Sequence, residues 1–188
     1  MRRVLADTNV LFPFSVMDLL LALSEDGLHE VIWTEALLDE WEEVIVREQR
    51  RTRETAASVT AAIREFFPDA EVERSEYQHL VSEMTGPDAT DHQHMAAAVA
   101  RRPCTILTKN APDFPPEPLA AHGVRVADPD DYLSELADEW PDEVAAAVVR
   151  LASEKQRPAR SPHDLADALE RAGVPRFAER LRKLLAER

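Results

Sequence analysis

The sequence predicts an α/β protein, a parallel sheet flanked by helices, with an all-helical C-terminal extension. Short apolar runs typical of buried strands alternate with stretches of helical period as far as residue 133. From about Trp140 only helical patterns follow. The length of 188 residues allows one domain and a small addition. We therefore expect a sheet domain at residues 1–133 and a helical module at 140–188.

The first apolar run, residues 4–12, predicts a buried central strand, because apolar and β-branched side chains dominate it. Asp7 interrupts the run, and Thr8 and Asn9 follow. A lone buried carboxylate is costly unless a cation, hydrogen bonds or exposure compensates it. Since strand ends open into the binding crevice of α/β sheets, we interpret Asp7 as a crevice carboxylate. The alternative is a turn-forming Asp after a strand of only three residues.

The remaining elements follow in order along the chain. Short strands are expected at 31–33, 70–72, 105–108 and 124–126. Helices are expected at 17–25, 35–49, 55–67, 75–84, 91–100 and from Asp128, then at 143–154, 161–173 and 175–185. Thr34 and Asp128 are good N-caps, and Thr90 with Gln93 has the spacing of a capping box. Residues 109–118 are expected to form a proline-rich loop and 156–160 a polar connector.

The chain is acidic, with a formal net charge of -14, and the charge is unevenly spread. Residues 1–149 carry 12 basic and 30 acidic groups, whereas residues 150–188 carry 10 basic and 6 acidic groups. An acidic body argues against nonspecific nucleic-acid binding by bulk charge, but it allows a nucleic-acid enzyme that uses metal ions. The basic tail is either a solvated helical face or a surface for phosphates or a partner.

Cysteine content and hydropathy indicate the compartment. Cys104 is the only cysteine, so no internal disulfide can form, and a reducing compartment is favoured. No apolar stretch of the sequence approaches the length of a membrane span. The sequence therefore predicts a cytoplasmic protein without a membrane segment.

Two further carboxylates join Asp7 as candidate site residues. Glu40 lies at the margin of the buried arc of its helix, and Asp91 lies in the first turn of the candidate helix at 91–100, where an anion is stabilised. Taken singly, Glu40 and Asp91 are each better explained as a surface or capping acid. Together, these three stand at strand ends and helix starts, from which their side chains can converge on one crevice.

Such a cluster has a chemical consequence. Two carboxylates about 4 Å apart repel by roughly 4 kcal/mol at an effective dielectric constant near 20. A hard divalent cation removes that cost, and Mg²⁺ and Mn²⁺ prefer oxygen ligands. The chemistry then available is activation of a water molecule against a phosphodiester.

At these residues the chain resembles the PIN-domain ribonucleases, the fold of the VapC toxins of bacterial toxin–antitoxin pairs. The resemblance covers about residues 1–133. Its motifs are Asp7-Thr8-Asn9-Val10, Glu40 within residues 38–44, Asp91 before residues 92–98, and residues 108–115. It implies a PIN-like parallel sheet, an acidic site for Mg²⁺ or Mn²⁺, an RNA substrate, a cognate antitoxin and frequent homodimers.

The resemblance also assigns roles to residues. Catalysis and metal binding fall to three carboxylates, and substrate contact or support falls to three further residues. These are Asp7, Glu40 and Asp91 in the first set, and Asn9, Asn110 and Asp113 in the second. Asn110 departs from the pattern, since many members of the family have Asp there. Asp113 and Asp88 are nearby substitutes, and whether one or two metal ions bind stays open.

Three functional hypotheses remain. The first is a metal-dependent endoribonuclease acting as a toxin. The second is a catalytically silent PIN-like module that binds RNA or protein. The third is an aspartyl-phosphate enzyme or receiver. Phosphatases that use an Asp nucleophile usually carry a second Asp two residues later, and the presence of Asn9 at that position argues against this hypothesis. His92 and His94 lie two apart on one helix and point in different directions, so they make a poor metal pair.

Overall fold

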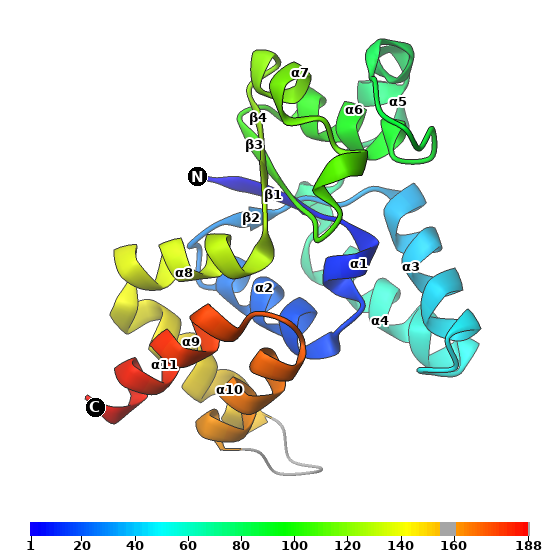
Figure 1. The fold of residues 1–188 in the computed structure, drawn as a ribbon. Coiled ribbons are helices and arrows are strands. Elements are labelled where there is room, and N and C mark those ends of the chain that lie inside the picture. The colour runs from blue at the N-terminus through cyan, green and yellow to red at the C-terminus, as the bar shows by residue number, and fades with distance from the viewer. Residues whose placement is uncertain (155–160, 188) are drawn as a thin grey trace.

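The structure is a computed structural model that describes residues 1–154 and 161–187, and it centres on a four-stranded sheet (Figure 1). The strands are β1 (Arg3–Ala6), β2 (Glu30–Val31), β3 (Cys104–Leu107) and β4 (Val124–Ala127). Their order is β2-β1-β3-β4, and every neighbouring pair is parallel. The central strands β1 and β3 are almost wholly buried, because helices cover both faces. The predicted α/β class and parallel sheet are confirmed.

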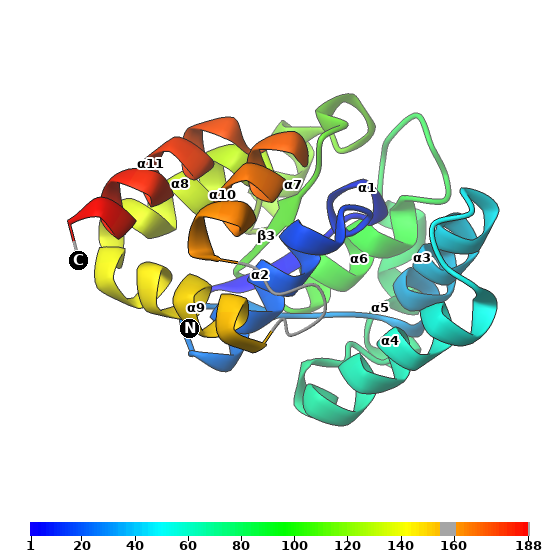
Figure 2. The same cartoon turned by 90° about the horizontal axis from the view of Figure 1, so that it is seen from below.

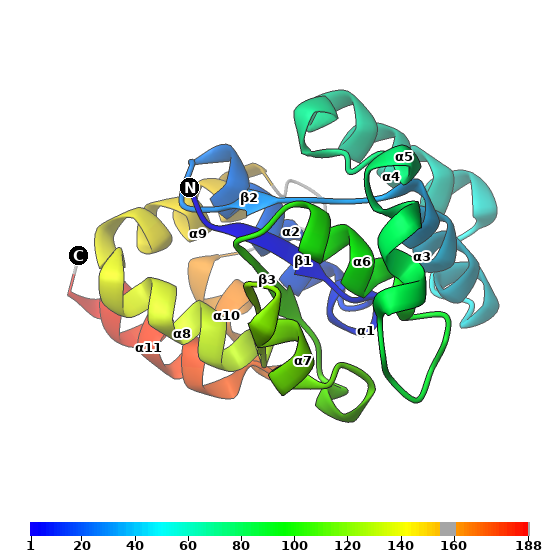
Figure 3. The same ribbon diagram turned by 90° about the horizontal axis from the view of Figure 1, so that it is seen from above.

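Eight helices belong to the part of the chain that carries the sheet. They are α1 (Thr8–Leu11), α2 (Phe14–Glu25), α3 (Glu35–Arg47), α4 (Arg53–Phe66), α5 (Arg74–Tyr77), α6 (His92–Ala100), α7 (Pro116–Ala121) and α8 (Pro129–Glu139). Helix α6 covers one face of the sheet and α2 the other, as the views from opposite sides in Figures 2 and 3 show. Helices α3 and α4 pack on each other beside this sandwich.

The first strand is shorter than predicted. It ends at Ala6, and Asp7 stands at the N-cap of α1, where its carbonyl accepts from the N–H groups of Val10 and Leu11. Residues 8–11 are therefore helical, and the prediction of a strand there is wrong. Apolar side chains at these positions are buried in either conformation, so their pattern could not separate strand from helix. The turn leaves the Asp7 carboxylate at the carboxyl edge of the sheet.

Two of the predicted helix caps are confirmed and one is wrong. The caps at Thr34 and Asp128 are confirmed, with Thr34 Oγ1 accepting from the Leu37 N–H at 3.0 Å. The capping box at Thr90 is wrong, because the Thr90 hydroxyl donates to Asp88 instead and Asp91 is the N-cap of α6.

Three segments between helices also differ from expectation. Residues 70–72 form no strand but one isolated bridge, from Glu71 to Trp33. The expected helix at 75–84 is divided into α5 and a 3₁₀ turn at Gln78–Glu83. The expected loop at 109–118 contains a 3₁₀ turn at Ala111–Asp113 and the start of α7. Its prolines misled the prediction, because Pro also suits the first turn of a helix.

The chain continues as three helices, α9 (Pro141–Glu154), α10 (Pro162–Arg171) and α11 (Pro175–Ala186). The expected connector at 156–160 lies outside the described residues. Helices α9 and α10 pack on α2, and α11 packs along α8 (Figure 2). Apolar side chains of these helices, among them Val148 and Leu181, belong to the same buried cluster as Leu19 of α2. The tail helices thus thicken the layer on the α2 face of the sheet.

Polar contacts also hold the tail helices. The buried Asp130 carboxylate of α8 accepts from the N–H groups of Arg176 at 3.1 Å and Phe177 at 2.8 Å, and so caps α11. Arg180 pairs with Asp138 of α8. Within the tail, Arg182 pairs with carboxylates of α10 and Lys183 with one of α11. Among the described residues of the tail, Arg176, Arg180, Arg182 and Lys183 are therefore paired with carboxylates.

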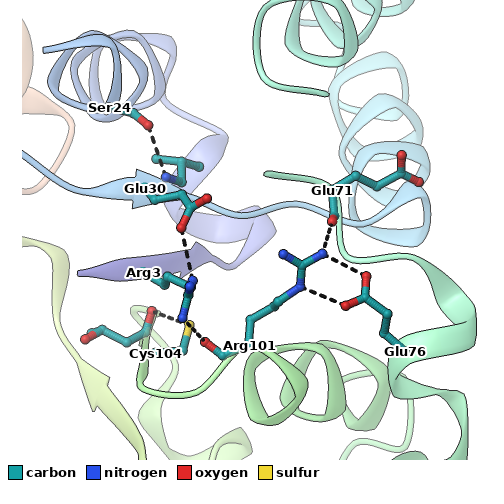
Figure 4. A network of polar contacts seen from close by, with 9 residues as sticks. Arg3, Ser24, Glu30, Glu71, Glu76, Arg101 and Cys104 are labelled. Atoms are coloured by element: carbon teal, nitrogen blue, oxygen red, sulfur yellow. Dashed lines mark hydrogen bonds and ion pairs between the residues drawn. The ribbon is translucent and has the colours of Figure 1, made fainter. Parts of the chain in front are cut away.

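The amino edge of the sheet carries a network that fixes the other end of α6 (Figure 4). Arg101, which follows α6, donates through Nε and Nη2 to the two carboxylate oxygens of Glu76, at 2.9 and 2.8 Å. Its Nη2 also donates to the Glu71 carbonyl at 2.7 Å. Arg3 of β1 donates to Glu30 of β2 at 3.0 Å. With this end of α6 held, Asp91 lies at the opposite, carboxyl edge of the sheet.

None of the helices within residues 1–154 and 161–187 is long and apolar enough to span a bilayer.

Candidate metal centre

A cavity of about 460 Å³ opens at the carboxyl edge of the sheet, and carboxylates dominate its lining. The acidic residues are Asp7, Glu40, Glu48, Asp88, Asp91 and Asp113, and the other lining residues are Thr8, Asn9, Phe12, Val44, Thr90 and Asn110. All six residues named from the sequence as site candidates line this one cavity. A larger cavity of about 890 Å³ lies at the amino edge, where Arg2, Arg3 and Arg125 are each in ion pairs.

Asp7 is held in place by both central strands. Its side chain lies at the end of β1 and is 6% exposed. Its Oδ2 accepts from the hydroxyl of Thr108, just after β3, at 2.8 Å and from the amide of Asn9. Burial raises the pKa of Asp7, the Thr108 hydrogen bond opposes that rise, and the charge of Glu40 adds to it. The carboxylate is thus oriented by donors but short of positive charge.

Glu40 projects from α3 toward α6, where a histidine meets it. His94 Nε2 lies 2.9 Å from Glu40 Oε2, and the imidazole is fully buried. His94 Nδ1 has no partner among the described residues, so we assign the proton to Nε2, which donates to Glu40. This hydrogen bond lowers the pKa of Glu40. The sequence analysis missed the role of His94, although its place three residues after Asp91 puts both on one side of α6.

Asp91 carries the clearest electrostatic signature of the cavity. It stands at the N-cap of α6, where its carbonyl accepts from the Met95 N–H at 3.0 Å but its side chain accepts no hydrogen bond from the helix. Burial raises the pKa of its carboxyl to about 6, with Asp7 the next cause and Asp88 and Asp113 adding smaller effects. A carboxyl group that resists ionisation because of other carboxylates is stabilised in its charged form by a cation. Asp7 and Asp91 also line the same cavity.

Two asparagines complete the lining. Asn9 Oδ1 accepts from the Lys109 N–H at 3.0 Å, so this side chain joins the ends of β1 and β3. The Asn110 amide donates to the Asp113 carboxylate. A neutral side chain at Asn110 therefore neighbours the carboxylate that the sequence suggested as its substitute.

The donor set suits a hard divalent cation. Carboxylate, amide and hydroxyl oxygens are ligands that Mg²⁺ and Mn²⁺ prefer. The Thr8 hydroxyl lies beside Glu40 and is buried. It forms no hydrogen bond of acceptable geometry with any described residue, Glu40 included. As the side chains stand, no three His, Cys, Asp or Glu residues of the described ranges converge closely enough to hold an ion. Asp7, Glu40 and Asp113 instead point at the Asn9, His94 and Asn110 donors described above.

Comparisons with known proteins show what the chain is similar to. A family model described as "PIN domain" matches residues 3–111, and one described as "VapC50 C-terminal domain" matches residues 129–183. A Mycobacterium tuberculosis protein described as "Putative ribonuclease VapC50" is 32% identical over 108 residues. That alignment covers 57% of this chain and 63% of the relative, so the chain spans less than two thirds of its length. No solved structure matches the chain.

Proposed function

The chain belongs to the PIN-domain family, and from that premise we propose that it is a metal-dependent endoribonuclease, the toxin of a VapBC-type toxin–antitoxin pair. The observation that supports the proposal is the acidic cavity at the carboxyl edge of the sheet, whose lining includes Asp7, Glu40 and Asp91. The relative described as a ribonuclease supports the substrate class.

In this proposal Asp7, Glu40 and Asp91 hold a Mg²⁺ or Mn²⁺ ion. When bound, the ion supplies a water molecule of lowered pKa and positive charge for the phosphodiester. The protein supplies the geometry. Thr108, just after β3, and Asn9 of α1 fix Asp7, and His94 fixes Glu40 from α6. Such supporting donors keep ligand oxygens oriented and charged, which is why they matter to affinity.

Asn9, Asn110 and Asp113 have supporting roles in this proposal. Asn9 ties Lys109 to Asp7, and so positions the segment after β3 against the cavity. Asn110 replaces a charge by an amide, which removes one repulsion from a lining that already has six carboxylates. Asp113 accepts a hydrogen bond from the Asn110 amide. A metal titration would measure how many ions the cavity binds.

The second candidate is a catalytically silent PIN-like module that binds RNA or protein. The neutral Asn110 and the lack of three converged ligands within the described chain favour it. The third is an aspartyl-phosphate enzyme, which requires Asp7 to be reached by a phosphoryl group although it is 6% exposed.

One experiment separates the three. The purified chain is incubated with RNA in Mn²⁺, in Mg²⁺ or in a chelator, beside Asp7→Asn and the exposed control Asp39→Asn. The proposal expects cleavage that needs metal, is lost in Asp7→Asn and is kept in Asp39→Asn. RNA binding without cleavage would favour the silent module. Capture of a phosphoryl mimic on Asp7 would favour the third candidate.

Further proposals concern the surroundings of the site. We propose a cognate antitoxin as partner, a homodimer, and the cytoplasm as location.

The lone Cys104 is buried, which raises the pKa of its thiol to about 12 and leaves it unreactive.

We also propose a nuclease domain at 1–133 and a helical module at 140–188 that positions a partner or RNA. The alternative is that the apolar side chains of the tail merely cover the sheet domain or a dimer mate, and the buried cluster that the tail shares with α2 supports it.

A further inference from the structure

One exposed segment combines unpaired positive charge with aromatic rings. It is the link between α3 and α4, where four of the seven residues at 47–53 are arginines in a chain of net charge -14. Arg50, Arg51 and Arg53 are exposed, and none forms an ion pair with any residue the structure describes. Arg47 contacts only the exposed Glu48, at 3.4 Å. We call these four residues the arginine link.

The backbone of the arginine link is well defined. Gln49 has a φ of 55° and ends α3 in a left-handed cap. The Arg50 N–H returns to the Ile45 carbonyl at 3.0 Å, and the Gln49 N–H to the Val46 carbonyl at 3.0 Å. Thr52 then caps α4 by accepting from the Thr55 N–H at 3.2 Å. The arginines are therefore presented from a fixed turn between two helices.

Two of the guanidinium groups lie over phenylalanine rings. Arg50 Cζ is 5.1 Å from the centroid of the Phe12 ring, and Arg51 Cζ is 4.5 Å from that of Phe14. The Phe14 ring in turn packs on the buried Trp41, with centroids 5.6 Å apart. A guanidinium held on a ring by cation–π attraction keeps its outer face and N–H edges for a ligand.

The arginine link borders the acidic cavity. Phe12 lines the cavity and carries Arg50 on its ring, and Glu48 also belongs to the lining. A polyanion approaching six carboxylates is repelled, so it needs fixed cations beside the cavity. The tail arginines Arg176, Arg180 and Arg182 do not meet this need, because each is paired with carboxylates.

We propose that the arginine link, with Phe12 and Phe14, holds single-stranded RNA where the strand enters the carboxylate cavity. The arginines bind phosphates, and the planar guanidinium–ring pairs offer faces on which unpaired bases stack. The inference rests on the proposed nuclease function for the presence of RNA. RNA is favoured over an acidic protein segment because stacking faces and unpaired cations occur together in this segment. Its Arg50–Phe12 pair lies at the rim of the acidic cavity, and Arg51 and Phe14 line a separate cavity of about 560 Å³.

The test uses the full chain with Asp7→Asn in every sample, so that RNA stays intact. Affinity for a fluorescein-labelled single-stranded RNA of about 16 nucleotides is measured by anisotropy at several salt concentrations. The variants are Arg50→Ala with Arg51→Ala, the same pair changed to Lys, and Arg102→Ala. Arg102 is an exposed arginine at the opposite, amino end of β3, without an ion pair to the described residues. Circular dichroism checks that every variant is folded.

The alanine pair should weaken binding at least 10-fold and reduce the slope of log K against log salt by about 1.4, since each phosphate contact on a single strand contributes about 0.7. The lysine pair should keep the slope but bind severalfold more weakly, because it keeps charge and loses stacking. Arg102→Ala should match the parent.

Unchanged affinity and slope in the alanine pair, or an equal loss in Arg102→Ala, would overturn the proposal. Loss of binding to an acidic protein partner with RNA binding intact would assign the surface to that partner instead. The assay is independent of cleavage. A chain that cleaves no RNA yet loses RNA affinity in the alanine pair keeps this inference while the nuclease proposal fails.

Discussion

Replacing Asp91 by Asn should stabilise the metal-free protein in a way that depends on pH. Burial and neighbouring carboxylates raise the pKa of Asp91 to about 6, from the ordinary value of about 3.8 for Asp. As pH rises from about 4 to 6, the unfolded chain loses this proton before the folded chain does, so the free energy of unfolding falls. Below about pH 4 the Asp91 carboxyl is protonated in both the folded and the unfolded chain. Above about pH 6 it is ionised in both, and the decrease in the free energy of unfolding stays constant.

The magnitude follows from the shift. A difference of about 2 pKa units corresponds to at most about 3 kcal/mol, because each unit is about 1.4 kcal/mol. Asp91 is only half buried, and solvent screening reduces the effect to about 1 kcal/mol. Asn caps a helix about as well as Asp, so the start of α6 should not suffer. A gain of about 1 kcal/mol raises the Tm of a chain of this size by about 2–4 °C.

The assay is thermal unfolding in a chelator near pH 7 and near pH 4, with the exposed Asp39→Asn as control. The Asp39 carboxylate is 71% exposed and lies outside the cavity. Asp91→Asn should exceed wild type near pH 7 and match it near pH 4, while the control follows wild type at both. If Asp91→Asn gains nothing near pH 7, or gains equally at both pH values, the carboxylates are not coupled as described.

Three further outcomes are expected. Mg²⁺ or Mn²⁺ at 100 times its Kd should add about 2.7 kcal/mol to the free energy of unfolding, measured as a rise in Tm. The variant Asp7→Asn should be more stable than wild type without metal and should not respond to metal. Equal melting of both proteins with and without metal would count against the site. His94→Ala should weaken Mn²⁺ binding about 10–100-fold in a calorimetric titration. His94→Gln should recover part of that affinity. Unchanged affinity in His94→Ala would mean that His94 does not position Glu40. Asp130→Ala should cost about 1–3 kcal/mol in urea unfolding, because it strands the N–H groups that begin α11; a cost near zero would show that the cap contributes nothing.

The sequence predicted the sheet because its strands are short, apolar and separated by helical patterns. It also indicated several residues that line the cavity, since Asp7 and Asn110 follow strands and parallel strand ends meet at one edge, but it did not name Glu48. It failed where two conformations bury the same side chains, as at residues 8–11, and where proline suits both a loop and a helix start, as at α7. Those choices depend on packing with distant segments.

The contacts that support the site could not be predicted from local pattern. His94 meets Glu40 across 54 residues of chain, and Thr108 meets Asp7 across 101. Asp130 caps a helix that begins 45 residues later. Each looks like an ordinary capping or surface residue in the sequence, because its partner is brought near only by the fold. The division of the chain near residues 133–140 stays a prediction.

The most direct test of the central claim is a crystal grown with Mn²⁺ and measured for anomalous scattering. We expect one strong peak inside the acidic cavity, with oxygens of Asp7, Glu40 and Asp91 about 2.1 Å away, as suits octahedral coordination by hard oxygens. Asp7 would then bind the ion while still accepting from Thr108. A peak elsewhere, or an empty cavity at saturating Mn²⁺ with Glu40 bound only to His94, would contradict the claim that these carboxylates form a metal centre.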